Sequence, residues 1–379
     1  MDEIVRALFF SPLPQGLFLL LSLLYLWMIL WFRRGWRRLE PFEESCRDPR
    51  MRVTVIVPCR NEADHLPALA EALAAQSYPA DLTEIVFVDD HSADNSRTVM
   101  EQLAGRYGNI RVMRNRGRGK KEALLTALES CTTERVITTD ADGRPGKEWI
   151  AVMMAYQRRT GASFIAGPVE VVAGKGFFSR FRVLEFYSLT GAGLGAAAHG
   201  HPLYCNGASL AYERKVVERY GDPLRRKIPG GDDVFLLHAV KRDDPAAVRF
   251  LKSRAAAVTV SEEEDIRSFF HQRRRWASKA TAYRDSDTII TALLVLLMNM
   301  ALLFTLFAGF FRWEWWLWCG LLWGVKSVAD LLLLKEVVSF YGQRPLLRIF
   351  PAAQLLYPFY LAGTALAGIF SFSLRKRGW

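Results

Sequence analysis

Long uninterrupted apolar stretches are the clearest feature of the hydrophobic pattern. Ala7–Phe32, Thr288–Phe311 and Ile349–Leu374 contain no charged residue. Each stretch exceeds the roughly 20 apolar residues that a helix needs to cross a bilayer, and core helices of soluble proteins seldom stay uncharged for so long. The pattern therefore predicts an integral membrane protein with one N-terminal and at least two C-terminal membrane helices.

A fourth apolar stretch, Trp313–Leu334, contains the charged residues Glu314, Lys326 and Asp330. Lys326 and Asp330 are four residues apart, so on a helix they share one face and can neutralise each other. We interpret them as a buried pair that holds helices together, with a role in transport or proton relay as the alternative. If this stretch crosses the membrane, the C-terminal region has about three membrane helices.

From Arg52 the pattern changes to short β-branched runs that alternate with helical stretches. The predicted strands are Val53–Cys59, Glu84–Asp90, Ile110–Asn115 and Arg135–Asp140, and the predicted helices are Glu62–Gln76, Asn95–Tyr107 and Lys120–Ser130. Such alternation is typical of an α/β fold with a mainly parallel sheet that is covered on both faces. We therefore expect a membrane anchor at 1–32, an α/β domain at 33–287 and a membrane region at 288–379.

One aromatic segment inside the α/β domain has two interpretations. Residues 174–200 are apolar but contain Arg180 and Arg182, and the uncharged part is too short to cross a bilayer. The segment fits an amphipathic helix in the membrane interface. It fits a buried helix of the α/β domain equally well.

Composition and charge exclude several classes of protein. Of the 379 residues, 51% are apolar, which is too many for a disordered or collagen-like chain. The formal net charge is +11, but much of the excess lies beside the apolar stretches, in Arg33–Arg38 and Arg375–Arg377. Membrane orientation explains this distribution better than binding to nucleic acid, which we do not expect.

The residues that flank the first apolar stretch predict its orientation. Asp2 and Glu3 stand where a signal peptide has basic residues, so we expect this stretch to remain as an anchor. Arginines beside a span stay in the cytoplasm, which predicts a cytoplasmic α/β domain on a plasma membrane, such as the bacterial inner membrane. The five cysteines show no C-x-x-C spacing, as expected for a reducing compartment without disulfides or a zinc site.

Polar residues follow the first two predicted strands. Pro58, Asn61 and Glu62 lie at the end of one strand, and Asp89 and Asp90 lie at the end of the next. Ligands of open parallel sheets bind beyond the carboxyl ends of the strands, and short acidic side chains there suit a planar base and a ribose. Turn formation and helix capping are the alternative interpretation of the same residues.

Asp140 and Asp142 form an acid-x-acid triplet after the fourth predicted strand. Side chains two positions apart in an extended segment point the same way, so both carboxylates can approach one divalent cation that bridges a diphosphate. Lys120 follows a glycine-rich turn and begins a predicted helix, where its charge suits a phosphate. A solvated basic turn is the alternative for Lys120.

Two further motifs stand later in the chain. Asp232 and Asp233 form an acidic pair, and one member of such a pair tends to hold a raised pKa and can accept a proton from a hydroxyl group. Capping of the following helix is the alternative. Gln272, Arg275 and Trp276 belong to a cluster whose guanidinium groups can clamp a diphosphate and whose indole can stack on a carbohydrate ring.

The order of these motifs from Val53 to about Trp276 resembles the membrane-bound family 2 glycosyltransferases, the group of the cellulose, chitin, hyaluronan and poly-N-acetylglucosamine synthases. The resemblance implies a GT-A fold and a nucleotide sugar, usually of uridine. Asp89, Asp90 and Lys120 would then contact the nucleotide and its diphosphate. Asp140 and Asp142 match the D-x-D motif that holds Mg²⁺ or Mn²⁺. Asp232 stands where Glu is commoner, Asp233 matches the general base, and the acceptor motif Q-x-x-R-W matches Gln272, Arg275 and Trp276.

From these parts we expect an inverting, metal-dependent transfer of sugar to a hydroxyl group. The acceptor has two interpretations. The Q-x-x-R-W motif and the predicted spans favour a growing β-linked poly- or oligosaccharide, whereas a lipid acceptor would need no channel for a polymer. A non-catalytic subunit that only binds a nucleotide sugar is a third alternative, although it would have no use for Asp233. The sequence assigns neither the donor sugar nor an oligomeric state.

Overall fold

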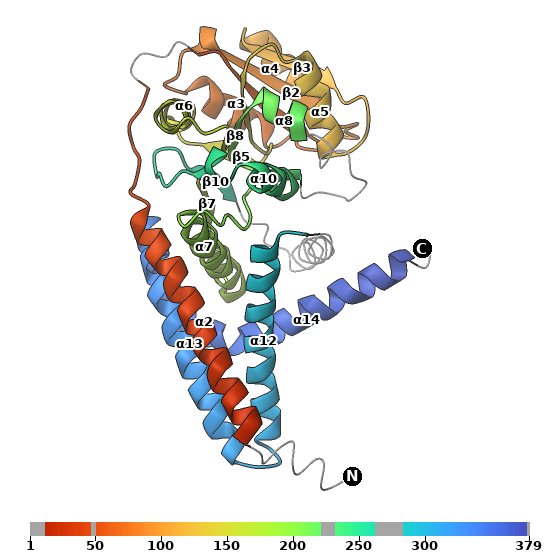
Figure 1. Ribbon diagram of the computed structural model, residues 1–379. Coiled ribbons are helices and arrows are strands. Elements are labelled where there is room, and N and C mark those ends of the chain that lie inside the picture. The colour runs from red at the N-terminus through yellow and green to blue at the C-terminus, as the bar shows by residue number, and fades with distance from the viewer. Residues whose placement is uncertain (1–11, 47–50, 221–231, 262–282, 377–379) are drawn as a thin grey trace. The chain divides into compact units, whose positions relative to one another are not determined.

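The computed structural model describes residues 12–46, 51–220, 232–261 and 283–376. The chain divides into two compact units (Figure 1). One, here called the membrane unit, comprises Met1–Arg37, Lys175–Ala196 and Glu264–Trp379. The other, the sheet unit, comprises Arg38–Gly174 and Ala197–Glu263. The predicted boundaries at 32 and 287 stay predictions.

A seven-stranded sheet with the order β3-β2-β1-β4-β8-β6-β9 organises the sheet unit. Its strands are β1 (Val53–Cys59), β2 (Thr83–Asp89), β3 (Ile110–Arg114), β4 (Arg135–Thr138), β6 (Phe164–Ala166), β8 (Leu210–Glu213) and β9 (Val248–Phe250). The first four are mutually parallel, and only β8 runs antiparallel to its neighbours. A small second sheet contains β5 (Gly143–Pro145), β7 (Val169–Val172) and β10 (Val258–Ser261). The predicted mainly parallel sheet is confirmed.

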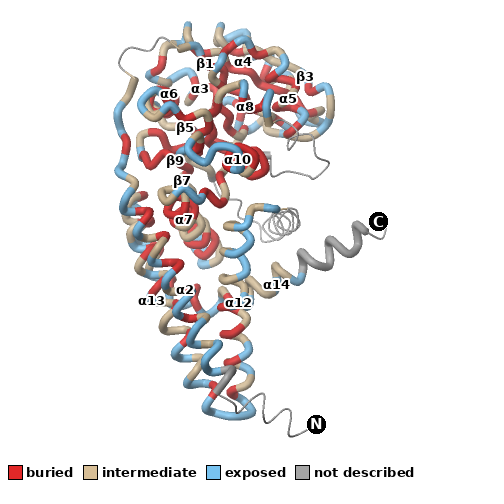
Figure 2. The backbone as a smooth tube through the Cα atoms, viewed as in Figure 1, coloured by how far each residue is buried: buried red, intermediate tan, exposed pale blue. Residues whose placement is uncertain are grey.

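Helices cover both faces of the central strands. They are α3 (Leu66–Ala74), α4 (Ser96–Arg106), α5 (Lys120–Ser130), α6 (Trp149–Thr160), α8 (Arg214–Tyr220) and α10 (Asp232–Asp243). Alternate residues of β1, such as Val55 and Val57, share a core with Leu66 and Trp149 of α3 and α6. Figure 2 shows the central strands as almost entirely buried. Burial on both faces explains why these strands read as continuous apolar runs in the sequence.

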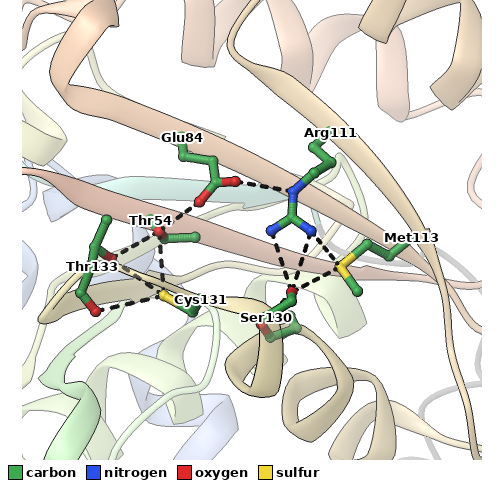
Figure 3. Close-up of polar contacts among 8 residues, drawn as sticks. Thr54, Glu84, Arg111, Met113, Ser130, Cys131 and Thr133 are labelled. Atoms are coloured by element: carbon green, nitrogen blue, oxygen red, sulfur yellow. Dashed lines mark hydrogen bonds and ion pairs between the residues drawn. The ribbon is translucent and has the colours of Figure 1, made fainter.

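A polar network closes the end of the sheet where the parallel strands begin (Figure 3). The Thr54 hydroxyl donates to Glu84 at 3.1 Å, and the Arg111 guanidinium donates to the same carboxylate at 3.0 Å. The buried Cys131 thiol lies within hydrogen-bonding distance of Thr54 and Thr133. All five cysteines are free. Side chains of the sheet itself occupy this end, whereas Asp89 ends β2 and Asp140 follows β4 at the opposite, carboxyl edge.

Among the residues that the structure describes, the membrane unit contains four helices that are long and apolar enough to cross a membrane, one N-terminal and three C-terminal. They lie in α2 (Pro12–Arg38), α12 (Ser286–Ala308), α13 (Glu314–Phe340) and η3 with α14 (Arg344–Ile349 and Phe350–Lys376). The predicted one N-terminal and about three C-terminal helices of membrane length are thereby confirmed, including the charged fourth stretch, which falls in α13. That each of them crosses a membrane stays a prediction. Pro358 lies inside α14, and the helix continues through it.

The charges inside α13 bind one another and their neighbours. Lys326 is 1% exposed, and its amine lies 2.7 Å from Asp330 and 2.8 Å from the side-chain oxygen of Gln354 on α14. The Tyr25 hydroxyl on α2 donates to Asp330 at 2.7 Å. The pair therefore joins three helices, as its interpretation as a buried structural pair predicts.

Helix α7 (Phe177–Ala197) packs against the candidate spans of the membrane unit. A Cβ added to Gly191 would lie 2.7 Å from Val337 on α13, and a Cβ at Gly195 would overlap the backbone of Phe32 on α2. The rings of Tyr187 and Tyr341 lie 5.0 Å apart. Most of the helix is buried (Figure 2). The helix is buried against the candidate spans and belongs to the membrane unit, so the interpretation as a buried helix of the α/β domain is wrong, and a place in the membrane interface stays a prediction.

Candidate active site

The carboxyl ends of β1, β2 and β4 meet at one edge of the sheet and bring the predicted acidic residues together. In register, Cys59 is paired with Asp89, and Ile56 is paired with Thr138 near the end of β4. Burial raises the pKa of the Cys59 thiol. The carboxylates of Glu62, Asp89 and Asp140 raise it further, which indicates that they lie around one point.

The loops after β1 and β2 hold each other through short side chains. The Asn61 amide N–H donates to the Ser92 hydroxyl at 3.1 Å, and the Asn61 side-chain oxygen accepts from Ala93 at 2.7 Å. Asp89 accepts from the Ser92 amide at 3.1 Å. Asn61 has a φ of 56°, a left-handed conformation that non-glycine residues rarely adopt. The turn interpretation is therefore correct for Asn61 and Asp89, and a role in binding remains a prediction.

Asp90 connects the end of β2 to the glycine-rich turn before α5. Both of its carboxylate oxygens accept from the Gly119 amide, at 2.8 and 2.9 Å, and one also accepts from the Asn115 side chain at 2.7 Å. His91, also at a φ of 56°, lies 2.8 Å from the Gly117 carbonyl through Nε2. These bonds fix the turn, whose next residue is Lys120.

Lys120 reaches the acid-x-acid triplet and forms an ion pair with Asp140. Burial, together with the carboxylates of Asp140 and Glu62, raises the pKa of Asp142 from 3.8 to about 6. Glu62 itself lies 2.7 Å from the ring of His65. Three carboxylates and one amine are thus concentrated beyond the ends of β1 and β4.

Asp233 lies near the same cluster although it is distant in sequence. The Gly207 amide donates to its Oδ2 at 3.0 Å, and the Val234 amide donates to its Oδ1 at 2.8 Å. A Cβ added to Gly207 would lie 3.1 Å from the Lys120 amine and 3.4 Å from Asp233 Oδ2. Lys120, Asp140 and Asp233 therefore converge around the backbone of Gly207.

The acid pair has the donor chemistry of a divalent cation site. Among the described residues no group of three His, Cys, Asp or Glu side chains is placed to hold a metal ion. Mg²⁺, however, is commonly bound by one or two carboxylates together with substrate phosphates. Asp140 is about one-third exposed, and the mutual repulsion that raises the pKa of Asp142 would be relieved by a cation. Asp140 and Asp142 therefore fit the predicted metal.

For several of the predicted site residues, the structure gives no side-chain contact at the candidate site. Gln272, Arg275 and Trp276 lie outside the described residues. The backbone of Asp232 begins α10, but its side chain is not described. Pro58 lies within β1, opposite Val88, one position before the strand ends.

Sequence reasoning did not single out Asn115, His91 or Gly207 as site residues. Asn115 is 2% exposed, and its amide bonds Asp90 and the Gly119 carbonyl. Its position directly after β3, at the same sheet edge as the acidic residues, could have indicated it as a site residue. Nothing in the sequence indicates Gly207, because its importance arises from its close approach to residues far away in the chain.

Comparison with known proteins agrees with this geometry. Residues 54–221 match the family model described as glycosyl transferase family 2. The match covers less than half of the chain, and these residues are similar to the family 2 glycosyltransferases.

Relatives match parts of the chain. A probable glycosyltransferase, YdaM of Bacillus subtilis, is 24% identical over 286 residues, which cover 68% of this chain and 64% of that protein. An undecaprenyl-phosphate 4-deoxy-4-formamido-L-arabinose transferase of Serratia proteamaculans is 37% identical over 98 residues, or 25% of this chain and 30% of that protein. The chain thus spans less than two thirds of these relatives.

One solved structure shares the fold over most of its length. The mannosyltransferase PcManGT from Pyrobaculum calidifontis, in complex with GDP-Man and Mn²⁺, superimposes with a TM-score of 0.56 at 21% identity. The alignment covers 94% of this chain and 97% of that protein. The GT-A fold that the sequence motifs implied is confirmed.

Proposed function

We propose that the protein transfers a sugar from a nucleotide sugar to an acceptor hydroxyl group and inverts the anomeric configuration. The observation that carries the proposal is the convergence of Lys120, Asp140 and Asp233 around Gly207. A basic group for a diphosphate, an acid for a metal and a carboxylate for a proton are the parts that such a displacement needs.

Asp233 acts as the general base in this proposal. Two amide N–H groups orient its carboxylate, at 3.0 and 2.8 Å. The carboxylate takes the proton of the acceptor hydroxyl as the oxygen bonds to the anomeric carbon, while the bond from that carbon to the leaving diphosphate breaks. A single displacement from the opposite side inverts configuration.

The remaining predicted residues position the donor. Asp89 and Asp90, with Pro58, Asn61 and Glu62, border the nucleotide, which we propose to be uridine-based, and Lys120 binds its diphosphate. Asp140 and Asp142 would hold Mg²⁺ or Mn²⁺, which neutralises charge on the departing diphosphate. Gln272, Arg275 and Trp276 complete the acceptor side, and the domain faces the cytoplasm.

For the acceptor we propose a hydroxyl group carried by a lipid. The four candidate spans and α7 line a partly open cavity of about 140 Å³ whose lining is mainly apolar, whereas a glycan channel requires polar walls. A relative in Serratia proteamaculans is named for undecaprenyl phosphate. This name supports a lipid acceptor but not the accepting group, because that lipid ends in a phosphate rather than a hydroxyl group. A growing β-linked glycan, which the Q-x-x-R-W motif favours, is the second candidate.

The test is release of nucleotide and formation of product by the purified full chain with a panel of UDP- and GDP-sugars. The wild type should turn over at least one donor with Mg²⁺ or Mn²⁺, and EDTA should stop it. Asp233→Asn should bind the donor normally but lose about 100-fold or more in kcat. The matched control is Asp243→Asn, at the exposed end of the same helix.

Analysis of the reaction products then distinguishes a lipid acceptor from a growing glycan. Product mass distinguishes a single sugar on a lipid from a polymer, and the anomeric coupling constant reports inversion. If the wild type binds nucleotide sugars but neither hydrolyses nor transfers them over the whole panel, the protein is a binding subunit and the proposal is wrong.

A further inference from the structure

The cavity in the membrane unit has one helix as a continuous wall. Side chains of α7 line it at intervals of three and four residues, so that a single face of the helix points into it. They are Phe181, Leu184, Glu185, Ser188, Leu189 and Ala192. The other walls come from the candidate spans α2, α12, α13 and α14.

The charged groups at the cavity are already bound to partners within the membrane unit. Lys326 pairs with Asp330 and Gln354 and also lies 5.1 Å from the centre of the Tyr357 ring. Glu185 accepts from the Tyr360 hydroxyl at 2.9 Å. An ionic ligand would have to displace these contacts in a low-dielectric environment, at a high cost in free energy. The cavity therefore favours an uncharged occupant.

Size and lining indicate the chemistry of that occupant. A cavity of about 150 Å³ lined by apolar side chains stays free of water and binds small hydrocarbons. The present cavity is of similar volume, but it is partly open and is also lined by Lys326, Asp330 and Gln354, so only its apolar side chains offer such a surface. It lies among helices with the length and composition of membrane spans. Within a bilayer, the hydrocarbon available to such a cavity is a lipid chain.

Helix α7 connects this wall to the candidate active site through the chain itself. It is inserted between β7 and β8 of the glycosyltransferase domain, and residues 198–206 lead from its end to Gly207. Gly207 donates to Asp233, the proposed base. A helix that lines the cavity is thus an integral part of the transferase sequence rather than an appended anchor.

We propose that this cavity binds a segment of the hydrocarbon chain of the lipid acceptor. The proposal rests on the proposed transfer to a lipid. The chain is isoprenoid or fatty-acyl, since both offer the same apolar surface. The headgroup that carries the accepting hydroxyl lies outside the cavity.

Photo-crosslinking of the full chain in phosphatidylglycerol vesicles tests the proposal. One arm contains an isoprenol with a diazirine in its chain, and the other contains phosphatidylglycerol with a diazirine-bearing palmitoyl chain. Labels mapped by mass spectrometry should fall on the cavity-lining residues of α7 and α13 in at least one arm, and that arm identifies the source. Labels confined to bilayer-facing residues such as Leu293 and Leu297 in both arms would refute it.

A variant that fills the cavity is compared with a variant that makes the same substitution outside it. Ala192→Leu adds volume inside the cavity and should reduce labelling several-fold. Ala292→Leu makes the same change at an exposed position of α12 and should leave labelling as in the wild type. Ser188→Leu is the second cavity variant, used if Ala192→Leu lowers the thermal midpoint. Undiminished labelling of a folded cavity variant would overturn the proposal.

Activity separates this proposal from the proposed function. A cavity variant should raise KM for the lipid acceptor and leave KM for the nucleotide sugar unchanged. Asp233→Asn should label like the wild type although transfer is lost. If no transfer occurs at all but the labels lie in the cavity, the proposed function fails while the binding site stands.

Discussion

Gly207 shows how little space separates the residues of the candidate site. Its missing Cβ would lie 3.1 Å from the Lys120 amine and 3.4 Å from Asp233 Oδ2, closer than most side-chain contacts. We expect Gly207→Ala to shift one of these groups by a few tenths of an ångström. Since a displacement of about 1 Å can cost about 100-fold in rate, kcat should fall by about 10-fold. Steady-state kinetics with the active donor measures this loss.

Gly105→Ala provides the control for this variant. Gly105 lies in α4 and has open space where a Cβ would be added. Alanine in a helix is more stable than glycine by roughly 0.5–1 kcal/mol, so this variant should be slightly more stable and fully active. If Gly207→Ala is as active as Gly105→Ala, the backbone does not constrain the site as described.

The lowered pKa of Glu148 should make the thermal stability of the protein depend on pH. The hydroxyl groups of Ser45 and Ser77 donate to its carboxylate at 2.6 and 2.8 Å, and these bonds lower the pKa of Glu148. A group whose pKa is lower in the folded state stabilises the fold above its unfolded pKa and loses this effect as the pH falls through its folded pKa. The wild type should therefore melt at a higher temperature than Glu148→Gln at pH 7.

The gap between the two melting temperatures should close as the pH falls below about 4, where the carboxyl group gains its proton. Circular dichroism melts between neutral and acidic pH measure it. If the difference in melting temperature does not change with pH, Glu148 stabilises the fold through its shape and not through its charge.

The role of a single residue could be predicted where a local sequence motif indicates it. It could not be predicted where it depends on contacts with residues far away in the chain. The sequence indicated Asp140 and Asp142 because an acid-x-acid triplet after a strand has its own signature. It could not show that Asp90 binds Gly119, because that bond depends on the turn before α5 folding back to the end of β2. The Lys120–Asp140 pair was equally invisible, since it joins residues on different elements.

Among the secondary-structure elements, the length of a strand determined whether its position could be predicted from the sequence. Strands β1 and β2 have seven residues each and appear as continuous apolar runs, so their positions were predicted almost to the residue. Strands β6 and β9 have three residues each, too few to show a period of two. The pairing of β6 with β8 and of β9 with β6 is determined by packing within the sheet rather than by local sequence.

Helix α7 could not be assigned from its sequence because its small residues matter only against their partners. Gly195 lies so close to the backbone of Phe32 on α2 that an added Cβ would overlap it. We expect Gly195→Ala to force α7 away from α2 and to destabilise the membrane unit by about 1–3 kcal/mol, the usual cost of overpacking. Close helix contacts in membranes depend on such small residues.

Gly324→Ala on α13 is the matched control, because nothing lies within 4 Å of the added Cβ. Thermal unfolding of the two variants in the same detergent, followed by near-ultraviolet circular dichroism, gives the comparison. Equal midpoints for the two variants would show that α7 does not depend on contact with α2.

For the whole molecule, the number of candidate spans was predictable from apolar length, whereas their orientation depends on charges at the links. The link between α13 and α14 precedes Arg344 and Arg348, and basic residues beside a span favour the cytoplasm. If α12, α13 and α14 all cross, this link lies on the same side as the sheet unit and the α12–α13 link lies on the other side. Arg375–Arg377 would then face outwards, against the same preference.

Cysteine labelling of spheroplasts decides between the two charge arguments. In a chain from which the five native cysteines have been removed, we expect Phe311→Cys, which replaces a side chain that is 90% exposed, to react with an impermeant maleimide. Pro345→Cys, at an exposed position near the start of η3, directly after the α13–α14 link, should react only after the cells are opened. If both react in intact spheroplasts or neither does, α13 does not cross the membrane, because a single crossing separates the two positions. If both react, α12 and α14 are the helices that cross, and the basic residues after α14 then lie on the cytoplasmic side, as the positive-inside preference requires.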